Sequence, residues 1–253
     1  QHAKLLQQLN IGLVPERAQA HYCLHYRGGQ YLITLARDER PLMRPIPAAA
    51  EAAAEKVFSK FRHISQWNFI KNLQPSQPQA KPPIQFVLHP QGQPPLVYDP
   101  AEPYIQLCHA KAEEPSPAYK FQFINRSEHR LYVACLYLDH LFEVEVNYFE
   151  PNVRLVDPGD EVWGVNGRAI RLRMPDYIRE YNWKDEILYL KIISSPTPFK
   201  VDMFALPPLD APEAGPLRSG TKGFEPEARQ PAALHWQSQL IEFRVRNPYW
   251  KEA

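Results

Sequence analysis

The sequence predicts a mainly β protein of the α+β class, in which an antiparallel β-sandwich follows a smaller α+β domain. Proline is abundant and glycine scarce, with 27 and 10 in 253 residues, and proline at this density separates short strands and disfavours a helical bundle. Strict alternation of apolar and polar residues beyond residue 118 is typical of half-buried strands. The charged, proline-containing stretch AKAEEPSPA predicts a boundary between two domains, which comprise residues 1–112 and 118–253.

The first domain is expected to contain a hairpin, one long helix and several short strands. Two β-rich runs, AHYCLHY and YLITLA, flank Gly28-Gly29, and glycine readily adopts the positive φ that a tight hairpin turn requires. From about Ala48 to Leu73, apolar residues recur every three positions, which predicts a helix with a broad apolar face. Proline turns then separate three strand candidates, IQFVLH, PLVYD and YIQLCH.

The second domain shows the strand pattern most clearly. Two runs, LYVACLYL and ILYLKII, are continuously apolar, as expected of central strands covered on both faces. Several short strands with turns between them predict a β-sandwich. The stretch 206–233 has no strand or helix pattern, and we expect a long loop there, either disordered or serving for binding. The segments that alternate apolar and polar side chains are 119–123, 142–148, 170–174 and 240–246.

Charge and hydropathy exclude some classes of partner. With 29 Lys and Arg against 28 Asp and Glu, the formal net charge is +1, so no overall field attracts nucleic acid or an acidic membrane surface. No apolar run reaches the roughly 20 residues that span a bilayer. Three widely spaced cysteines differ from the even, dense set of a secreted disulfide framework, so we expect a cytoplasmic protein. Because the chain begins with Gln1 and shows no leader chemistry, we also expect a fragment of a longer protein.

Histidine and cysteine alternate on the first strand of the hairpin, at His21, Cys23 and His25. Alternate strand residues share one face, so the three side chains are candidates for metal or thiol chemistry. Their roots are about 7 Å apart along a strand, however, and the sequence has no second Cys/His pair with metal spacing. We therefore favour a structural hairpin over a metal or thiol site, and the sequence predicts no metal and no cofactor.

The other candidates for catalysis are weak. Cys135 lies in the most apolar strand, where burial raises the pKa of a thiol and denies access to it. Cys108 and the histidine after it are adjacent on a strand and point to opposite faces. Glu143 and Glu145 share a strand face, where a hydrolase could hold an acid–base pair, but a solvated outer face explains the same alternation. The sequence therefore predicts no catalytic residue, and a hydrolase would need a concave pocket around these carboxylates.

Two basic segments are candidates for ligand binding. The first combines arginines with aromatic rings, a pairing that binds phosphates or stacks on bases. The second lies in the loop 206–233, where the glycines and cations of RSGTKG are suited to cradle an anion, although the spacing is not that of a P-loop. Net neutrality disfavours nucleic acid as the ligand. The predicted binding residues are Arg171, Arg173, Tyr181 and Trp183 in the first segment and Arg218 and Lys222 in the second.

Two stretches carry a resemblance to a known family. They are KFQFINRSEHRLYVACLYLDHLFEVEVNYFEP and RAIRLRMPDYIREYNWKDEILYLKIISSPTPFKVDMFALPPL. They resemble the β-rich region behind the caspase-like Cys/His peptidase domain of large bacterial caspase-family proteins. The shared pattern is an N-R-S…L-Y strand, an L-Y-L strand, a D-E-x-L-K-L-I-x-S type strand and an L-x-x-P-P-L exit. RHISQWNFIKNL resembles the helix that precedes this region, so the resemblance covers about residues 20–246.

The resemblance implies an accessory role. Caspase-like peptidases place a His/Cys dyad in an α/β domain, with the cysteine in a context such as Q-A-C-x-G, whereas the cysteines here read HYCLH, QLCHA and VACLY. No catalytic residue carries over. The resemblance implies a non-catalytic C-terminal region of a bacterial caspase-like protease that mediates docking, assembly or partner recognition. Its protein partner would be its own protease domain or another subunit. A stand-alone β-sandwich that binds a peptide or glycan is the alternative.

Overall fold

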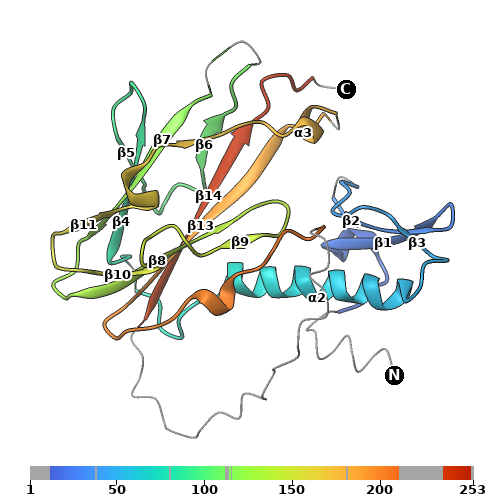
Figure 1. The fold of residues 1–253 in the computed structure, drawn as a ribbon, viewed down its shortest axis with the longest axis horizontal. Coiled ribbons are helices and arrows are strands. Elements are labelled where there is room, and N and C mark those ends of the chain that lie inside the picture. Colours follow the sequence, from blue (N-terminus) through green and yellow to red (C-terminus); the bar gives the residue numbers. More distant parts are fainter. Residues whose placement is uncertain are drawn as a thin grey trace, which may run out of the picture. The chain divides into compact units, whose positions relative to one another are not determined.

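The fold is mainly β with one long helix, as the sequence predicts. The computed structural model describes residues 12–37, 39–79, 81–111, 114, 116–180, 182–210 and 236–251. The chain forms two compact units, and Figure 1 shows their helices and strands. The described part of the first unit comes from residues up to Ile70, from Leu141–Glu143 and from 206–210, and the remaining described residues form the second unit.

The first unit carries the predicted hairpin. The first two strands pair antiparallel, and the third pairs with the second. Gly28 and Gly29 have φ angles of 56° and 74°, and this positive φ lets the chain reverse in a two-residue turn. The elements of this unit are η1 (Arg17–Gln19), β1 (Tyr22–Arg27), β2 (Gln30–Leu35), β3 (Ile46–Pro47) and α2 (Ala53–Asn72). The last two residues of α2 belong to the second unit.

The segment Leu141–Glu143 packs along α2 within the first unit. The indole Nε1 of Trp67 donates to the carbonyl oxygen of Glu143 at 3.2 Å, and the ring of Phe142 meets the indole edge-on at 5.1 Å. Phe142 has a φ of 62°, which breaks any strand at this point. The alternating stretch 142–148 therefore contains only the short strand β9 (Val144–Glu145), rather than the longer strand that its pattern predicts.

The second unit is the predicted β-sandwich, built from two sheets. The six-stranded sheet has the order β10-β8-β13-β14-β6, with β9 beside β8, and the five-stranded sheet has the order β11-β7-β4-β5, with β12 beside β7. Pairing is antiparallel except between β6 and β14, which run parallel, so the sandwich is mixed rather than wholly antiparallel. One buried core joins both sheets, with Phe86, Phe121 and Phe243 in mutual ring contact.

The strands of the six-stranded sheet are β6 (Ile105–Cys108), β8 (Leu131–Leu138), β9, β10 (Val153–Val156), β13 (Asp185–Ser195) and β14 (Gln237–Arg246). Those of the five-stranded sheet are β4 (Ile84–Pro90), β5 (Leu96–Val97), β7 (Ala118–Asn125), β11 (Glu161–Trp163) and β12 (Ile170–Arg171). The helical elements are η2 (Gly164–Gly167), α3 (Asp176–Glu180) and η3 (Asp202–Phe204).

The division between the units differs from the boundary that the sequence suggests at 112–118. The strand β4 precedes that boundary, yet all of its residues pair with β7, and β6 likewise pairs with β14. Residues 71–111 therefore belong to the sandwich. The proline turns between these short strands have the composition of a linker, but the backbone groups of the strands form hydrogen bonds with strands beyond it.

The central strand β13 is buried on both faces, as its continuous apolar pattern predicts. Leu188 and Leu190 join the core between the sheets, whereas Lys191 points to the opposite face. Its side chain is fully buried, and Nζ donates to the carbonyl oxygen of Lys71, in the last turn of α2, at 2.8 Å. The partial negative charge of a helix C-terminus favours a cation there. Burial nevertheless lowers the pKa of Lys191 to about 8.

Replacing Lys191 by Met is expected to stabilise the protein below pH 8. The pKa of this lysine is 10.5 in the ordinary case and about 8 when folded, so between these values the unfolded wild type binds more protons and the free energy of unfolding rises with pH. The shift corresponds to up to roughly 3 kcal/mol. Chemical denaturation from pH 7 upwards measures both profiles, and the exposed Lys120→Met is the control, expected to keep the wild-type slope. Parallel profiles for wild type and Lys191→Met would contradict the assignment.

Candidate functional site

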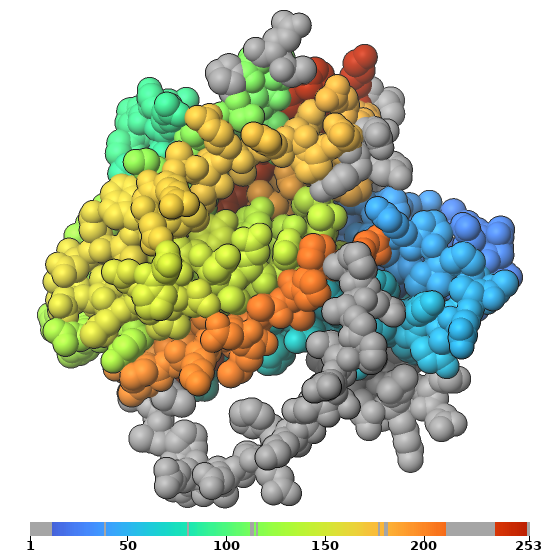
Figure 2. All heavy atoms as spheres, viewed as in Figure 1, coloured from blue at the N-terminus to red at the C-terminus, as the bar shows by residue number. Residues whose placement is uncertain are grey.

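A cavity of about 470 Å³ opens in the second unit. Tyr137 on β8 and Leu188 on β13 line it from the six-stranded sheet, and Arg171 on β12 lines it from the five-stranded sheet. Figure 2 shows the surface hollowed beside the yellow segment that contains β12. The volume is within the range of cavities that bind small molecules or side chains. This cavity is therefore the candidate site.

Two tyrosines and apolar side chains form one wall of the cavity. The rings of Tyr137 and Tyr148 stack with their centroids 5.6 Å apart, and Leu188 and Val165 lie beside them in the lining. Burial raises the pKa of Tyr148 well above its ordinary value, so this phenol stays neutral. The wall offers flat apolar surface with hydroxyl groups, which suits an aromatic or aliphatic part of a ligand.

The turn η2 holds Val165 in a strained backbone conformation, with φ 49° and ψ 39°. Branched residues rarely adopt this region, and such strain costs on the order of 1–3 kcal/mol. The N–H of Val165 donates to the carbonyl oxygen of Tyr148 at 2.6 Å. Gly164 lets the turn approach β7 closely, because a Cβ there would lie 3.3 Å from Cβ of Phe121. Local strain of this kind gathers at functional sites, which supports the cavity as one.

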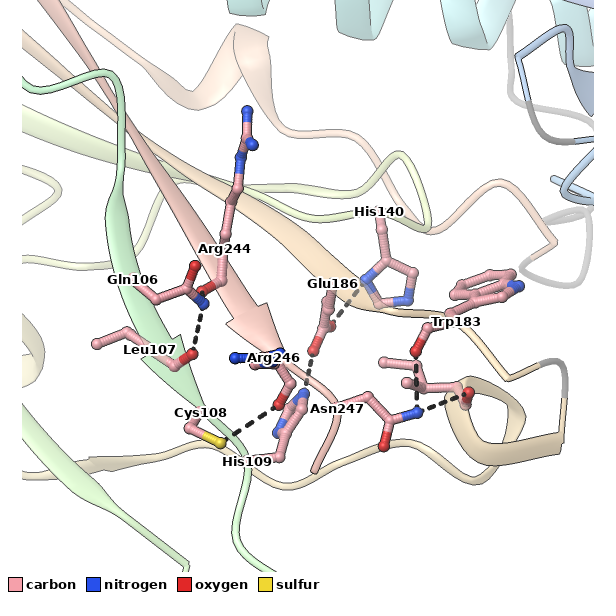
Figure 3. Close-up of polar contacts among 11 residues, drawn as sticks. Gln106, Leu107, Cys108, His109, His140, Trp183, Glu186, Arg244, Arg246 and Asn247 are labelled. Atoms are coloured by element: carbon pink, nitrogen blue, oxygen red, sulfur yellow. Dashed lines mark hydrogen bonds and ion pairs between the residues drawn. The ribbon is translucent and has the colours of Figure 1, made fainter. Parts of the chain in front are cut away.

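A buried carboxylate, Glu186, lies between two histidines in the lining. The ends of β6, β8 and β14 and the start of β13 meet at one edge of the sheet, and this brings the three residues together. Nε2 of His109, after β6, lies 2.8 Å from Oε2 of Glu186, and Nδ1 of His140, after β8, lies 2.9 Å from Oε1. Figure 3 shows both contacts. Glu186 is 6% exposed and His109 3%.

The two histidines keep Glu186 ionised. Burial alone would raise the pKa of this carboxyl group, but the hydrogen bonds and charges of His109 and His140 together bring it below the ordinary value. With Nε2 of His109 assigned as the donor to Glu186, Nδ1 of the same ring is buried and has no hydrogen-bond partner among the residues that the structure describes. A buried nitrogen without a partner is costly.

Trp183 packs against His140, and Asn247 holds the segment that carries this tryptophan. The ring of Trp183 meets His140 edge-on, with centroids 6.3 Å apart. The side-chain amide of Asn247, just after β14, donates to the carbonyl oxygens of Trp183 and Ile178 at 2.9 and 3.4 Å, as Figure 3 shows. These contacts tie the loop after α3 to the end of the sheet.

A second carboxylate, Glu145 on β9, is half-buried in the lining. Burial and the nearby charge of Asp139 raise its pKa. Glu143, which the sequence places on the same solvated strand face, lies in the first unit instead. Glu145 and Glu186 thus have opposite pKa shifts within one cavity, which is the arrangement of an acid–base pair. Both oxygens of Glu186 are already in contact with histidines, however.

The predicted binding residues separate in the structure. Arg171 and Arg173 are exposed and line the cavity. Nη1 of Arg171 donates to the carbonyl oxygen of Ser116 at 3.0 Å, and Arg173 has no hydrogen bond or ion pair with any residue that the structure describes. Trp183 belongs to the support of His140 rather than to the cavity lining. The other three, Tyr181, Arg218 and Lys222, lie outside the described residues.

The cysteines and histidines that the sequence offered as candidates for catalysis or metal binding lie among strand and core residues. On β1, Nε2 of His25 lies 2.9 Å from Oγ1 of Thr34, and Cys23 is opposite that threonine in the register. Burial raises the pKa of Cys135, as predicted, and Sγ of Cys108 donates to the carbonyl oxygen of Arg246 at 3.7 Å.

The structure also bears on metal and membrane binding. Within the described ranges, no group of three or more His, Cys, Asp and Glu side chains is placed to hold a metal ion. None of the described helices is long and apolar enough to cross a membrane.

Sequence reasoning missed the group formed by Glu186, His109 and His140. One signal was present, because Glu186 shares the inward face of β13 with Leu188 and Leu190, and a charge in such a position needs a buried partner. The sequence did not identify the partner, because His109 lies 77 residues away along the chain.

Comparisons with known proteins give no family. No family model matches the chain, and no curated protein matches it. Among solved structures, the chain is similar to the crystal structure of the E. coli chaperone DraB, with a TM-score of 0.30 and 13% identity, over 66% of this chain and 58% of that chain. The match spans less than two thirds of DraB, and a likeness at this TM-score carries no conclusion.

Replacing Glu186 by Gln is expected to lower the free energy of unfolding at pH 7 by roughly 2 kcal/mol, because a charged acceptor for buried His109 and half-buried His140 is lost. The folded-state pKa of Glu186 lies below the ordinary 4.5, so its stabilisation is present above that pH and disappears as pH falls through the folded value. Urea denaturation of wild type and variant should therefore converge in acid. The control is Glu242→Gln, in a partly exposed pair with Arg244, which should cost under about 1 kcal/mol. Equal costs for the two variants would refute the role of Glu186.

Proposed function

We propose that this chain is a non-catalytic recognition module whose sandwich binds a peptide segment of a protein partner in the cavity. The observation that carries the proposal is the convergence of arginines, carboxylates and a tyrosine wall in one cavity of about 470 Å³. Binding sites typically combine apolar surface with a few placed polar groups. The cavity is sized for a side chain or a chain end rather than for a folded domain.

Binding is favoured over catalysis by how the reactive groups are engaged. Cys135 is part of the core, Tyr148 has a raised pKa, and both oxygens of Glu186 contact histidines. A nucleophile needs an accessible atom that a neighbouring base activates. The described lining supplies well-supported polar groups instead, and these serve to orient a ligand.

A charged peptide is favoured over a neutral glycan. Among the described residues, Arg171 donates only to a neutral carbonyl oxygen, and Arg173 bonds to none of them. Exposed guanidinium groups in a binding site gain most from an ionised partner. A neutral sugar would stack on the tyrosine wall but would leave both cations without a counter-charge.

The resemblance to caspase-family proteins suggests where such a module acts. We infer that it forms the C-terminal region of a bacterial caspase-like protease and recognises the protease domain or another subunit. The support is the sequence pattern at about residues 120–209, including the NRS turn and the DEILYLKIIS strand. The cavity lies within this stretch for most of its lining.

Blocking the cavity is expected to abolish peptide binding. Asn147 is exposed and lines the cavity, so Asn147→Trp fills it without disturbing the core. Peptides selected from a displayed random library on the wild type should bind Asn147→Trp at least about tenfold more weakly, measured as Kd by fluorescence anisotropy. Gln93→Trp, in an exposed turn away from the lining, is the matched control and should bind like wild type. Failure to select any peptide, or equal binding by Asn147→Trp, would refute the proposal.

The caspase-family assignment has its own test. The native reading frame upstream of Gln1 is expected to encode a Cys/His peptidase domain with a His/Cys dyad. Sequencing the genomic context answers this directly. An upstream frame that stops, or that encodes an unrelated domain, would remove the protease context and leave the recognition module as a stand-alone protein.

A further inference from the structure

We propose that the ligand of this cavity carries a carboxylate, which Arg171 and Arg173 bind at the cavity mouth. The inference rests on the proposed function and names its ligand class. The carboxylate is either the C-terminus of a peptide or an Asp or Glu side chain, since both present the same group.

The two arginines are the only cationic side chains in the described lining of the cavity, apart from histidine. Arg171 donates one N–H to the carbonyl oxygen of Ser116, which fixes the direction of the side chain and leaves other donors available. Arg173 has no described partner. The planar guanidinium matches a carboxylate with two parallel hydrogen bonds. The guanidinium groups at the mouth therefore offer N–H donors that the described residues do not use.

The acidic groups of the lining disfavour a phosphate or a nucleic acid. Glu186 is ionised, and Glu145 lies in the same cavity. A dianion would face repulsion from these carboxyl groups, whereas a single negative charge held at the two arginines faces less of it. The formal net charge of +1 also provides no long-range attraction for a polyanion.

The tyrosine wall belongs to the same lining as the two arginines. Its stacked rings offer flat apolar surface, which a peptide covers with an apolar side chain and a simple inorganic anion does not.

A smaller cavity continues the site beyond Arg173. It measures about 190 Å³, shares Leu172 and Arg173 with the larger one, and is also lined by Lys111, Arg179 and the carboxylate of Glu114. The guanidinium of Arg179 lies 5.3 Å from the ring centroid of Tyr249. The cations of this lining outnumber its one carboxylate, so we expect tighter binding when acidic residues flank the anchoring carboxylate.

The test uses three fluorescein-labelled pools of random heptapeptides. One has a central Glu and an amidated C-terminus, one a central Gln and a free C-terminus, and one a central Gln and an amidated C-terminus. The wild type is expected to bind a carboxylate-bearing pool at least about tenfold more tightly than the neutral pool, by anisotropy at low salt. The first two pools distinguish a side-chain carboxylate from a terminal one. Sodium phosphate should compete no better than sodium chloride of equal ionic strength.

Variants assign the effect to the two arginines. Arg171→Gln with Arg173→Gln should lose the preference for carboxylate while keeping its binding of the neutral pool, and the double Lys variant should recover part of the preference, because charge returns without the planar fork. Arg168→Gln removes one positive charge from an exposed arginine outside the lining and should keep the wild-type preference. Thermal melting confirms that each variant is folded.

The outcomes separate the two proposals. If no pool binds the wild type, the proposed function fails and the inference fails with it. If the pools bind equally, or if the double Gln variant keeps the preference, the carboxylate inference alone is overturned. Stronger competition by phosphate than by chloride overturns the choice of a carboxylate over a phosphate.

Discussion

Burial of the central strand β13 on both faces is the constraint on which the second unit depends. The strand has 11 residues and pairs with β8 on one side and β14 on the other. Every polar side chain in such a strand must find its partner within the protein, because burial of an unpaired charge costs several kcal/mol. Lys191 meets the requirement at the end of α2, and Glu186 meets it with two histidines.

The contacts that compensate the buried charge of Glu186 also shape the cavity. Its two histidines come from the ends of β6 and β8. Trp183, in the loop after α3, packs against His140, and Asn247 at the end of β14 donates to the carbonyl oxygen of Trp183. Five segments are therefore joined at one edge of the sheet and give the cavity a buried polar group. Arg171 and Arg173 in the same lining are exposed.

Several separate features mark the same cavity. The strained backbone of Val165, the raised pKa of Glu145 and the unpartnered nitrogen of His109 each carry a cost in free energy. Their coincidence in one lining is the reason for assigning recognition to this cavity.

The sequence by itself determined the fold class, the hairpin turn at Gly28-Gly29, the long helix and the central strands, because these follow from local backbone preferences and from periodicity along a few residues. It also proposed Arg171 and Arg173 as binding residues. The domain division was decided only by the tertiary structure, since β4 and β6 found partners beyond a linker-like stretch. The tertiary structure also decided the contact of Glu186 with His109. These side chains are 77 residues apart, and they meet only because separate strands end at the same edge of one sheet.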